Sequence, residues 1–368
     1  MKKLISILTS LLICASLGYA QEIRGCHAFR NGVALIKLEN KSLCFIDKTG
    51  KRIGEFYTSA SEFSEGLAVF STKDKLGFID TTGNEVILLP KDTYGIARNF
   101  SNGLACVSLK NAKKPYGFID KTGEEIIPAK FDKVSSFSDS VAWANIEVLT
   151  IGGSDGTRKR LVDPNGNTLM TKNYDAVKDF HEGRAWINDI KVKNRKRHYV
   201  DAIHYYKTSD SYAQWGLIDI KGKQIVKPQY ADCLDFSEGL AAVKKDDKWG
   251  YIDTKGKEVL PLIYESVESF KNGLAKVYQG RWYSYIDKTG KPVITVEYLT
   301  DCESFADGMA RIKKKFKYGF IDTTGNELIP PIYEEATDFN EGFAIAKIDG
   351  NWIVIDKQGN KVGVVDVK

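Results

Sequence analysis

The sequence contains little of the chemistry from which metal and redox sites are built. Its 368 residues include only four His and six Cys. No two cysteines form a Cys-x-x-Cys pair, and the histidines have no metal-ligand spacing. The sequence therefore indicates no metal site, and we expect no cofactor.

The short motifs of common enzyme classes are also missing. The chain has no nucleophile elbow, no P-loop and no dinucleotide-binding fingerprint, so no catalytic residue can be named. Two carboxylates that hydrolyse a glycosidic bond are partners in space, not in sequence. An enzyme acting on cell-wall or glycan material therefore stays open as an alternative to a non-catalytic protein.

A large excess of one charge is absent as well. The chain has 53 Lys and Arg against 48 Asp and Glu, a net charge of +5. Loss of Lys2 and Lys3 with an N-terminal leader would reduce it to +3. A charge so near neutral does not indicate specific binding to nucleic acid.

Long apolar runs are confined to the N-terminus. There, Lys2 and Lys3 precede a largely apolar stretch from Leu4 to Leu17, and small residues stand at Gly18 and Ala20. This pattern is typical of a secretory signal peptide over residues 1–20 that is cut after Ala20. No later run approaches the ~18 residues of a membrane helix, so we expect an exported protein without a transmembrane segment. Its compartment would be the periplasm, the cell surface or the medium.

The clearest feature of the sequence is an internal repeat. An Ile/Val-Asp-x-x-Gly unit occurs nine times, and it alternates with a second anchor, Phe-x-x-Gly-x-Ala, that also occurs nine times. Only the fourth copy of the second anchor lacks its Gly, with Ser140 there. Successive anchors are usually 17 residues apart, which gives a period of 34 residues. The anchor Phe residues are Phe29, Phe63, Phe100, Phe137, Phe180, Phe236, Phe270, Phe305 and Phe339.

The residue chemistry of one period predicts strands. Glycine-bearing turns leave no room for a helix of ~10 residues, and apolar residues alternate at period two. In the copy at 236–269 we expect strand A at Leu240–Lys244, strand B at Trp249–Asp253 and strand C at Lys257–Leu260. Three such short strands cannot bury a core alone, whereas stacked copies can.

This layout resembles the WG repeat family of bacteria, also called KWG repeats. Literal Trp-Gly pairs stand at Trp215-Gly216 and Trp249-Gly250, with variants at Leu76-Gly77, Tyr116-Gly117 and Tyr318-Gly319. The first, fourth, seventh and ninth copies lack that Gly. The resemblance covers the chain from Phe29 to its end. It implies a repeat array and no particular activity, because the family is known chiefly as arrays of unassigned function.

The repeated Asp is predicted to form turns. An Asp at the first turn position accepts hydrogen bonds from the N–H groups two and three residues on, and the Gly three residues later can take the positive φ of a hairpin. A catalytic group is normally placed once, so nine copies favour a structural role over catalysis or calcium binding. The residues are Asp47, Asp80, Asp120, Asp163, Asp219, Asp253, Asp287, Asp322 and Asp356.

Two further repeated positions are predicted to fill the core. One is an aromatic residue six positions before the anchor Phe, for which a sugar-stacking surface is the alternative; it holds Tyr57, Tyr94, Phe131, Tyr174, Tyr230, Tyr264 and Tyr333. The other lies three residues before the anchor and holds Cys26, Cys233 and Cys302, where other copies have Ala or Val. Cysteine there acts as a small hydrophobic residue.

The repeat is broken by two insertions, near 149–160 and 188–213. Both fall between strands A and B, and function on a repeat scaffold tends to lie in such insertions. Arg and Lys could bind carboxylate, phosphate or sulfate there, with Tyr as stacking faces. The alternative is that these tips are charged for solubility. The candidate binding residues are Arg158, Lys159, Arg160, Lys191, Lys193, Arg195, Lys196, Arg197, Tyr199, Tyr205 and Tyr206.

Together these patterns predict an all-β protein. After the leader, residues 21–368 should form nine three-stranded antiparallel meanders in an open, curved, solenoid-like array, with a closed propeller-like ring as the alternative. The expected function is a binding or scaffolding module for a partner protein or an anionic envelope polymer such as a glycan. A purely structural envelope protein is a further alternative.

Overall fold

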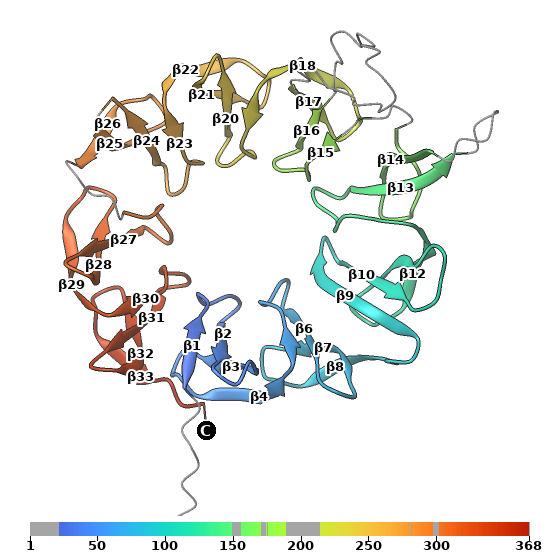
Figure 1. Cartoon of the computed structure of the whole chain (residues 1–368), viewed down its shortest axis with the longest axis horizontal. Coiled ribbons are helices and arrows are strands. Elements are labelled where there is room, and N and C mark those ends of the chain that lie inside the picture. Colours follow the sequence, from blue (N-terminus) through green and yellow to red (C-terminus); the bar gives the residue numbers. More distant parts are fainter. Residues whose placement is uncertain are drawn as a thin grey trace, which may run out of the picture.

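The computed structural model describes residues 22–148, 156–170, 174, 176–188, 214–280, 282–296 and 302–367. Within these ranges the chain is all-β and has no helix. Nine small antiparallel sheets follow one another around a ring (Figure 1). We number the units from 1 to 9 by their anchor Phe and keep the letters A, B and C for the three main strands of each unit.

The strand bounds follow the repeat. Units 1 to 5 contain β1 Ile23–Cys26, β2 Val33–Leu38, β3 Leu43–Asp47, β4 Arg52–Tyr57, β5 Ser59–Ala60, β6 Leu67–Ser71, β7 Leu76–Asp80, β8 Glu85–Leu89, β9 Tyr94–Ser101, β10 Leu104–Leu109, β11 Tyr116–Ile119, β12 Glu125–Phe131, β13 Ala142–Val148, β14 Gly156–Val162, β15 Ala176–Val177, β16 Arg184–Asn188, β17 Trp215–Asp219 and β18 Gln224–Tyr230. Units 6 to 9 contain β19 Asp232–Cys233, β20 Leu240–Lys245, β21 Lys248–Asp253, β22 Glu258–Tyr264, β23 Ser266–Val267, β24 Ala275–Gln279, β25 Trp282–Ile286, β26 Pro292–Val296, β27 Met309–Lys314, β28 Lys317–Asp322, β29 Glu327–Tyr333, β30 Glu335–Ala336, β31 Phe343–Ile348, β32 Asn351–Asp356 and β33 Lys361–Val364.

Most units have one strand more than the sequence predicted. Seven of the nine sheets are four-stranded, because a short strand before the anchor Phe pairs with strand A. In unit 6 this is β19, whose Cys233 pairs with Val243. Units 4 and 8 have only an isolated bridge at this place, Val134 to Ala144 and Cys302 to Ile312. Strand C lies toward the outside of the ring (Figure 1).

The expectation of an open array is wrong, because the ring is closed. One core cluster contains Phe29 and Ala34 of unit 1 together with Ile345, Trp352 and Val354 of unit 9. Past β33, the Asp366 N–H donates to the Gly50 carbonyl at 2.8 Å. The last unit therefore packs on the first as every other unit packs on its neighbour, and no terminal unit exposes a core face.

The anchor Phe residues lie in the contacts between units, as predicted. None is more than 5% exposed. Most meet an aromatic residue of strand B in the preceding unit, and the ring centroids of Phe78 and Phe100 are 4.8 Å apart. Tyr251 and Phe270 repeat the contact at 4.9 Å. These edge and tilted ring pairs bury the largest apolar surfaces of two units against each other.

A hydrogen bond links every unit to the next one. The residue two positions after the anchor Phe has a positive φ, as does the Gly that follows it in eight units, so the pair forms a tight turn. Its side-chain oxygen accepts the N–H of the corresponding Gly, or Ser140, in the next unit. The acceptors are Asn31, Glu65, Asn102, Asp139, Glu182, Glu238, Asn272, Asp307 and Glu341.

The last of these bonds closes the ring. Glu341 of unit 9 accepts the N–H groups of Asn31 at 2.6 Å and Gly32 at 2.7 Å in unit 1. The Lys48 ammonium lies 3.3 Å from the same carboxylate. Burial alone would raise the pKa of Glu341, but the Gly32 and Lys48 hydrogen bonds outweigh it and lower the pKa below its ordinary value.

The charge of the acceptor matches the residue that faces it. When the acceptor is a carboxylate, the next unit often has a Lys directly after its turn Asp. The pairs are Lys48 with Glu341, Lys121 with Glu65, Lys288 with Glu238 and Lys357 with Asp307. When the acceptor is an Asn, the facing residue is uncharged: Thr81 for Asn31, Pro164 for Asn102 and Thr323 for Asn272. Two carboxylates are exceptions, since Asp139 faces Ile220 and Glu182 faces Thr254. Beside Glu182, Arg184 donates to the Thr254 carbonyl at 2.6 Å.

The Gly of the Trp-Gly pair is required by strand C. In unit 6, β22 shifts register between the pairs Trp249–Tyr264 and Tyr251–Leu260, around Pro261. A Cβ on Gly250 would lie 2.7 Å from the carbonyl oxygens of Leu260 and Pro261. Unit 7 has Ser284 at this place and pairs it directly with Thr295. In unit 6 the Gly is therefore required by the close approach of strand C to strand B.

Replacing Glu341 with Ala should weaken the closure of the ring. The change removes two hydrogen bonds to a charged acceptor and leaves Lys48 without its partner, so we expect a loss of about 1–2 kcal/mol in unfolding free energy. The amides of Asn31 and Gly32 should also exchange faster in hydrogen-exchange mass spectrometry. Glu258→Ala is the matched control, since this exposed carboxylate on β22 has no hydrogen-bonding or ion-pair partner in the described chain. Unchanged protection at residues 31–32 in Glu341→Ala would contradict the role of Glu341 in closure.

Candidate binding rim

The hairpin ends between strands A and B form a distinct surface of the ring. Strand A starts at the anchor turn, and strand B ends at the Asp-x-x-Gly turn, so both turns lie at the same end of the sheet. The A–B turns lie at the other end. We call this surface the A–B rim; in the described chain it comprises residues 37–43, 71–76, 109–116, 244–248, 313–317 and 347–351.

Several lysines on the A–B rim have no acidic partner. Lys75 pairs with Glu85 and Lys314 with Glu327, which is ordinary for exposed charges. Within the described residues, no carboxylate lies within ion-pair distance of Lys37, Lys41, Lys73, Lys245, Lys313 or Lys315. Lys313 instead lies over the Tyr318 ring, 5.0 Å from its centroid. The rim therefore carries positive charge that no carboxylate of the described chain neutralises.

The candidate residues of the first insertion lie in a strand rather than in a loop. Arg158, Lys159 and Arg160 belong to β14, where they pair with Ile146, Asn145 and Ala144. Lys159 and Arg160 are half-buried, and the Arg160 guanidinium donates to the Met170 carbonyl at 3.4 Å. Anion binding by these residues stays a prediction.

The second insertion lies outside the described residues. This applies to the candidates Lys191, Lys193, Arg195, Lys196, Arg197, Tyr199, Tyr205 and Tyr206. The sequence analysis did not select the lysines of unit 1, Lys37 and Lys41. Their signal was present in the repeat frame, because both stand at the A–B turn where other units also carry Lys.

The nine repeated Asp residues form turns with one difference from the expected geometry. The Asp120 carboxylate accepts the Thr122 N–H at 2.9 Å and the Glu124 N–H at 3.0 Å, so its donors lie two and four residues on. The Gly123 N–H, three residues on, donates to the Asp120 carbonyl at 3.0 Å. Gly123 has φ 87°, and the corresponding Gly of every other unit also has a positive φ.

Side-chain hydroxyls strengthen several of these turns. Thr324 donates its hydroxyl to Asp322 at 2.7 Å, and the N–H groups of Asn326 and Thr324 add 2.9 Å bonds. The Thr324 hydroxyl is the main cause of a lowered pKa, which is about 2 for Asp322. The same hydroxyl contact lowers the pKa of Asp120 and Asp287.

The cysteines and the aromatic row are parts of the core. Cys44, Cys106, Cys233 and Cys302 are buried, Cys26 is half-buried, and all five are free. Burial raises the pKa of Cys44 to about 12 and that of Cys106 to about 11, so these thiols are protonated at neutral pH. Six members of the aromatic row are at most 8% exposed, and only Tyr94 is half-buried. The core interpretation of this row is confirmed, and a sugar-stacking surface is excluded for those six.

The described part of the chain offers no obvious metal or membrane feature. No three acidic, His or Cys side chains within it are grouped so that they could hold a metal ion. No helix in the same ranges is long and apolar enough to cross a membrane.

Comparison with known families agrees with the repeat geometry. The family model described as "WG containing repeat" matches seven stretches that together make up more than half of the chain: residues 77–113, 116–147, 160–189, 215–249, 249–281, 283–317 and 318–352. The chain belongs to this family. No curated protein matches it in sequence.

One solved structure shows that a similar fold occurs elsewhere. A crystal structure of a eukaryotic initiation factor is similar with a TM-score of 0.57 and 10% identity, covering 90% of this chain and 95% of that one. BamB from Moraxella catarrhalis gives a TM-score of 0.32 and 13% identity, covering 93% of both chains. At 10% identity, the first similarity is one of fold alone.

Lowering the pH should remove the stabilisation that the turn carboxylates provide. A carboxylate with a depressed folded-state pKa stabilises the fold above its unfolded pKa of about 3.9, and this contribution is lost as the pH falls toward the folded value. For Asp322 the loss should fall between about pH 4 and about pH 2.

The Thr324 hydroxyl provides a direct test. Thr324→Val keeps the side-chain shape but removes the donor, so the Asp322 carboxyl pKa, followed by carbon NMR, should rise. Thr323→Val is the matched control, because Thr323 has no hydrogen-bonding partner in the described chain. An equal pKa in both variants would show that the hydroxyl does not set the titration of Asp322.

Proposed function

We propose that this WG repeat protein is an exported binding scaffold whose A–B rim binds an anionic polymer or the acidic surface of a partner protein. The observation that carries the proposal is a set of rim lysines for which the described chain offers no acidic partner: Lys37, Lys41, Lys73, Lys245, Lys313 and Lys315. Uncompensated positive charge along one surface of the ring attracts anions and favours an anionic partner.

The use of the repeated residues supports this assignment. The anchor Phe residues, the turn acceptors and the turn Asp residues connect units or close turns, so their side chains are already engaged. The A–B rim departs most from the repeat, since both insertions fall there. A rigid ring with variable hairpin ends suits a surface that presents several weak contacts at fixed positions.

Charge-neutral variants of the rim can separate site binding from general charge. Lys73, Lys245, Lys313 and Lys315 changed together to Gln should lower the NaCl concentration that elutes the protein from immobilised dextran sulfate. Each exposed contact contributes only about 0–1 kcal/mol, so the fourfold change should have a clear effect and single changes a small one. Neutral dextran should retain neither protein.

The matched control makes the same change of charge at the opposite end of the sheets. Lys255, Lys257, Lys271 and Lys291 are exposed, lack ion-pair partners in the described chain and lie near the Asp-x-x-Gly and anchor turns. Their change to Gln should shift elution much less. Replacing residues 191–213 with a short turn should weaken retention while the melting temperature is kept. An equal decrease of the eluting NaCl concentration in the rim and control variants would contradict binding at the rim.

The export part of the proposal rests on the pattern from Lys2 to Ala20. Mass spectrometry of the protein from its native cells should give a mature chain that begins at Gln21. A chain that retains Met1, or one that carries lipid on Cys14, would overturn it.

A further inference from the structure

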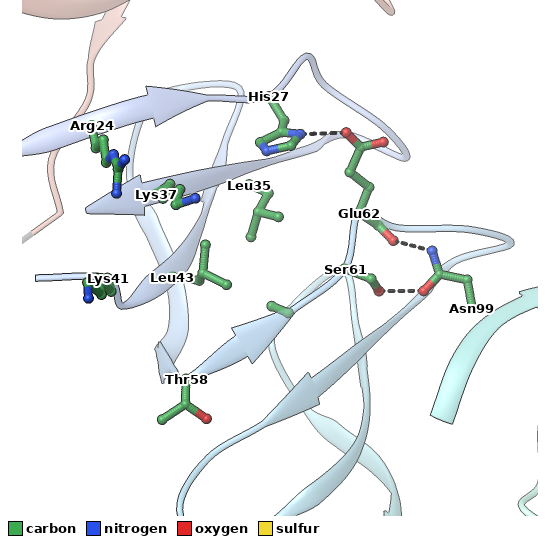
Figure 2. A pocket seen from close by; sticks show the side chains of 11 residues that line it. Arg24, His27, Leu35, Lys37, Lys41, Leu43, Thr58, Ser61, Glu62 and Asn99 are labelled. Carbon is green, nitrogen blue, oxygen red and sulfur yellow. Dashed lines mark hydrogen bonds and ion pairs between the residues drawn. The ribbon is translucent and has the colours of Figure 1, made fainter. Parts of the chain in front are cut away.

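A cavity lies between the sheets of units 1 and 2. Its volume is about 660 Å³, within the range of sites that hold small organic ligands. It is lined mainly by β1, β2, the β2–β3 turn and the segment around β5, with Asn99 from β9 (Figure 2). Because Lys37, Lys41 and Leu43 belong to the A–B rim, the cavity opens on that surface.

One side of the cavity is cationic. Arg24, Lys37 and Lys41 line it together, and Figure 2 shows all three on the side formed by β1, β2 and the β2–β3 turn. All three are exposed. No carboxylate of the described chain lies within ion-pair distance of any of them. Leu35 and Leu43 lie between these cations and the opposite side and supply an apolar surface.

The other side of the cavity is polar and already paired. Its one carboxylate, Glu62, lies 2.7 Å from the His27 Nδ1 and 2.6 Å from the Arg30 Nε. Asn99 donates to the Glu62 carbonyl at 3.0 Å and contacts the Ser61 hydroxyl. Glu62 is therefore already engaged by His27 and Arg30, and within the described residues the positive charge across the cavity has no counter-charge.

At the position of unit 1 that lines the cavity, the aromatic residue found in several other units is missing. At the Trp position of the Trp-Gly pair, unit 8 has Tyr318 and unit 9 has Trp352, and a Lys lies over each ring. In unit 1 the corresponding residues are Leu43 and Lys37, which are cross-strand partners. A Leu fills less of the groove toward the next unit than a Trp, and Lys37 has no ring beneath it.

Unit 1 also lacks the acids that would neutralise its cations. In unit 9, Glu335 pairs in register with Lys347 and forms an ion pair at 3.4 Å. In unit 1 the corresponding register pair is Gly25 with Lys37. The preceding position holds Glu334 in unit 9, where it pairs with Lys317. That position holds Arg24 in unit 1 and Thr58 in unit 2. Around this groove unit 1 therefore differs from unit 9 at three positions, and each difference leaves its cations without a partner or adds a cation.

We propose that this cavity binds a phosphate or sulfate ester carried on a small organic body such as a sugar. The Arg24 guanidinium suits the planar face of an oxyanion, and Lys37 and Lys41 add two mobile ammonium groups. Leu35 and Leu43 pack against the apolar side of the body. This inference rests on the proposed function, which supplies the anionic character of the partner. It adds one discrete subsite to the rim.

Isothermal titration calorimetry with defined probes tests the ligand class. Glucose 6-phosphate and glucose 6-sulfate should bind to the full chain and glucose should not, and inorganic phosphate should bind more weakly than glucose 6-phosphate. A stronger response to the phosphate ester would identify the doubly charged group as preferred, since a phosphate monoester carries about −1.5 to −2 at pH 7. Absence of binding of both esters at about 1 mM would overturn the proposal.

Two variants introduce residues that other units carry at these positions and should therefore fold. Leu43→Trp places the residue of units 5, 6 and 9 in the groove and should fill the cavity. Gly25→Glu places a carboxylate opposite Lys37, as Glu335 stands opposite Lys347, and a Cβ on Gly25 would meet no atom within 4 Å. Each should weaken glucose 6-phosphate binding at least about tenfold without lowering the melting temperature.

Lys245→Gln is the control, because it removes a rim charge far from the cavity and should leave ester affinity unchanged. Full affinity in Leu43→Trp, or an equal loss in Lys245→Gln, would contradict a discrete site. The Lys73, Lys245, Lys313 and Lys315 variant should lose retention on dextran sulfate while keeping ester binding. Gly25→Glu should show the reverse, so failure of the subsite can be distinguished from failure of the rim.

Discussion

The bond from the anchor turn of one unit to the backbone N–H of the next one controls this fold. It uses a turn in which both central residues have positive φ, so an N–H group points away from its own sheet and can be reached by the neighbour. The acceptor is always Asn, Asp or Glu, and the anchor Phe packs beside it. Because the same contact joins Glu341 to Asn31 and Gly32, the first and last units need no capping residues.

The local structure could be predicted from the sequence because it depends on nearby residues. Asp120 and Gly123 define their turn within four residues, and the alternation in 239–253 defines two strands. Closure depends on the rotation between neighbouring units, which would be about 40° for nine equal steps around a circle. No single residue encodes that angle. It results from how Phe–aromatic contacts and turn bonds fit together, so an open array and a ring have the same residue pattern. The sequence did not predict the additional strand, because a strand of two residues such as Ser59–Ala60 is too short to show alternating apolar and polar positions.

The candidate site was predictable in location but not in detail. The Lys-rich turns pointed to one end of the sheets, and the unpaired lysines lie there. The run Arg158–Arg160 was expected at a hairpin tip, whereas it lies in β14, where Arg160 donates to the Met170 carbonyl. The sequence did not predict the cavity beside unit 1, because the features that distinguish it are missing side chains and not a motif. Gly25, Arg24 and Leu43 are unremarkable alone, and they become informative only beside Glu335, Glu334 and Trp352 at the same repeat positions.

A ring of this kind separates the residues that hold it together from those that can vary. Each unit contacts only its two neighbours, so a change in one groove alters that groove and leaves the others intact. At the end of the sheets that carries the anchor turns, the residue facing the acceptor varies with the acceptor. Lys121 faces the carboxylate of Glu65, whereas the uncharged Thr81 faces the amide of Asn31. In unit 1 the aromatic ring and the two carboxylates that stand at the corresponding positions of unit 9 are absent, and Arg24, Lys37 and Lys41 have no acidic partner in the described chain. Uncompensated positive charge beside a cavity of ligand size is the arrangement expected where a bound anion supplies the counter-charge.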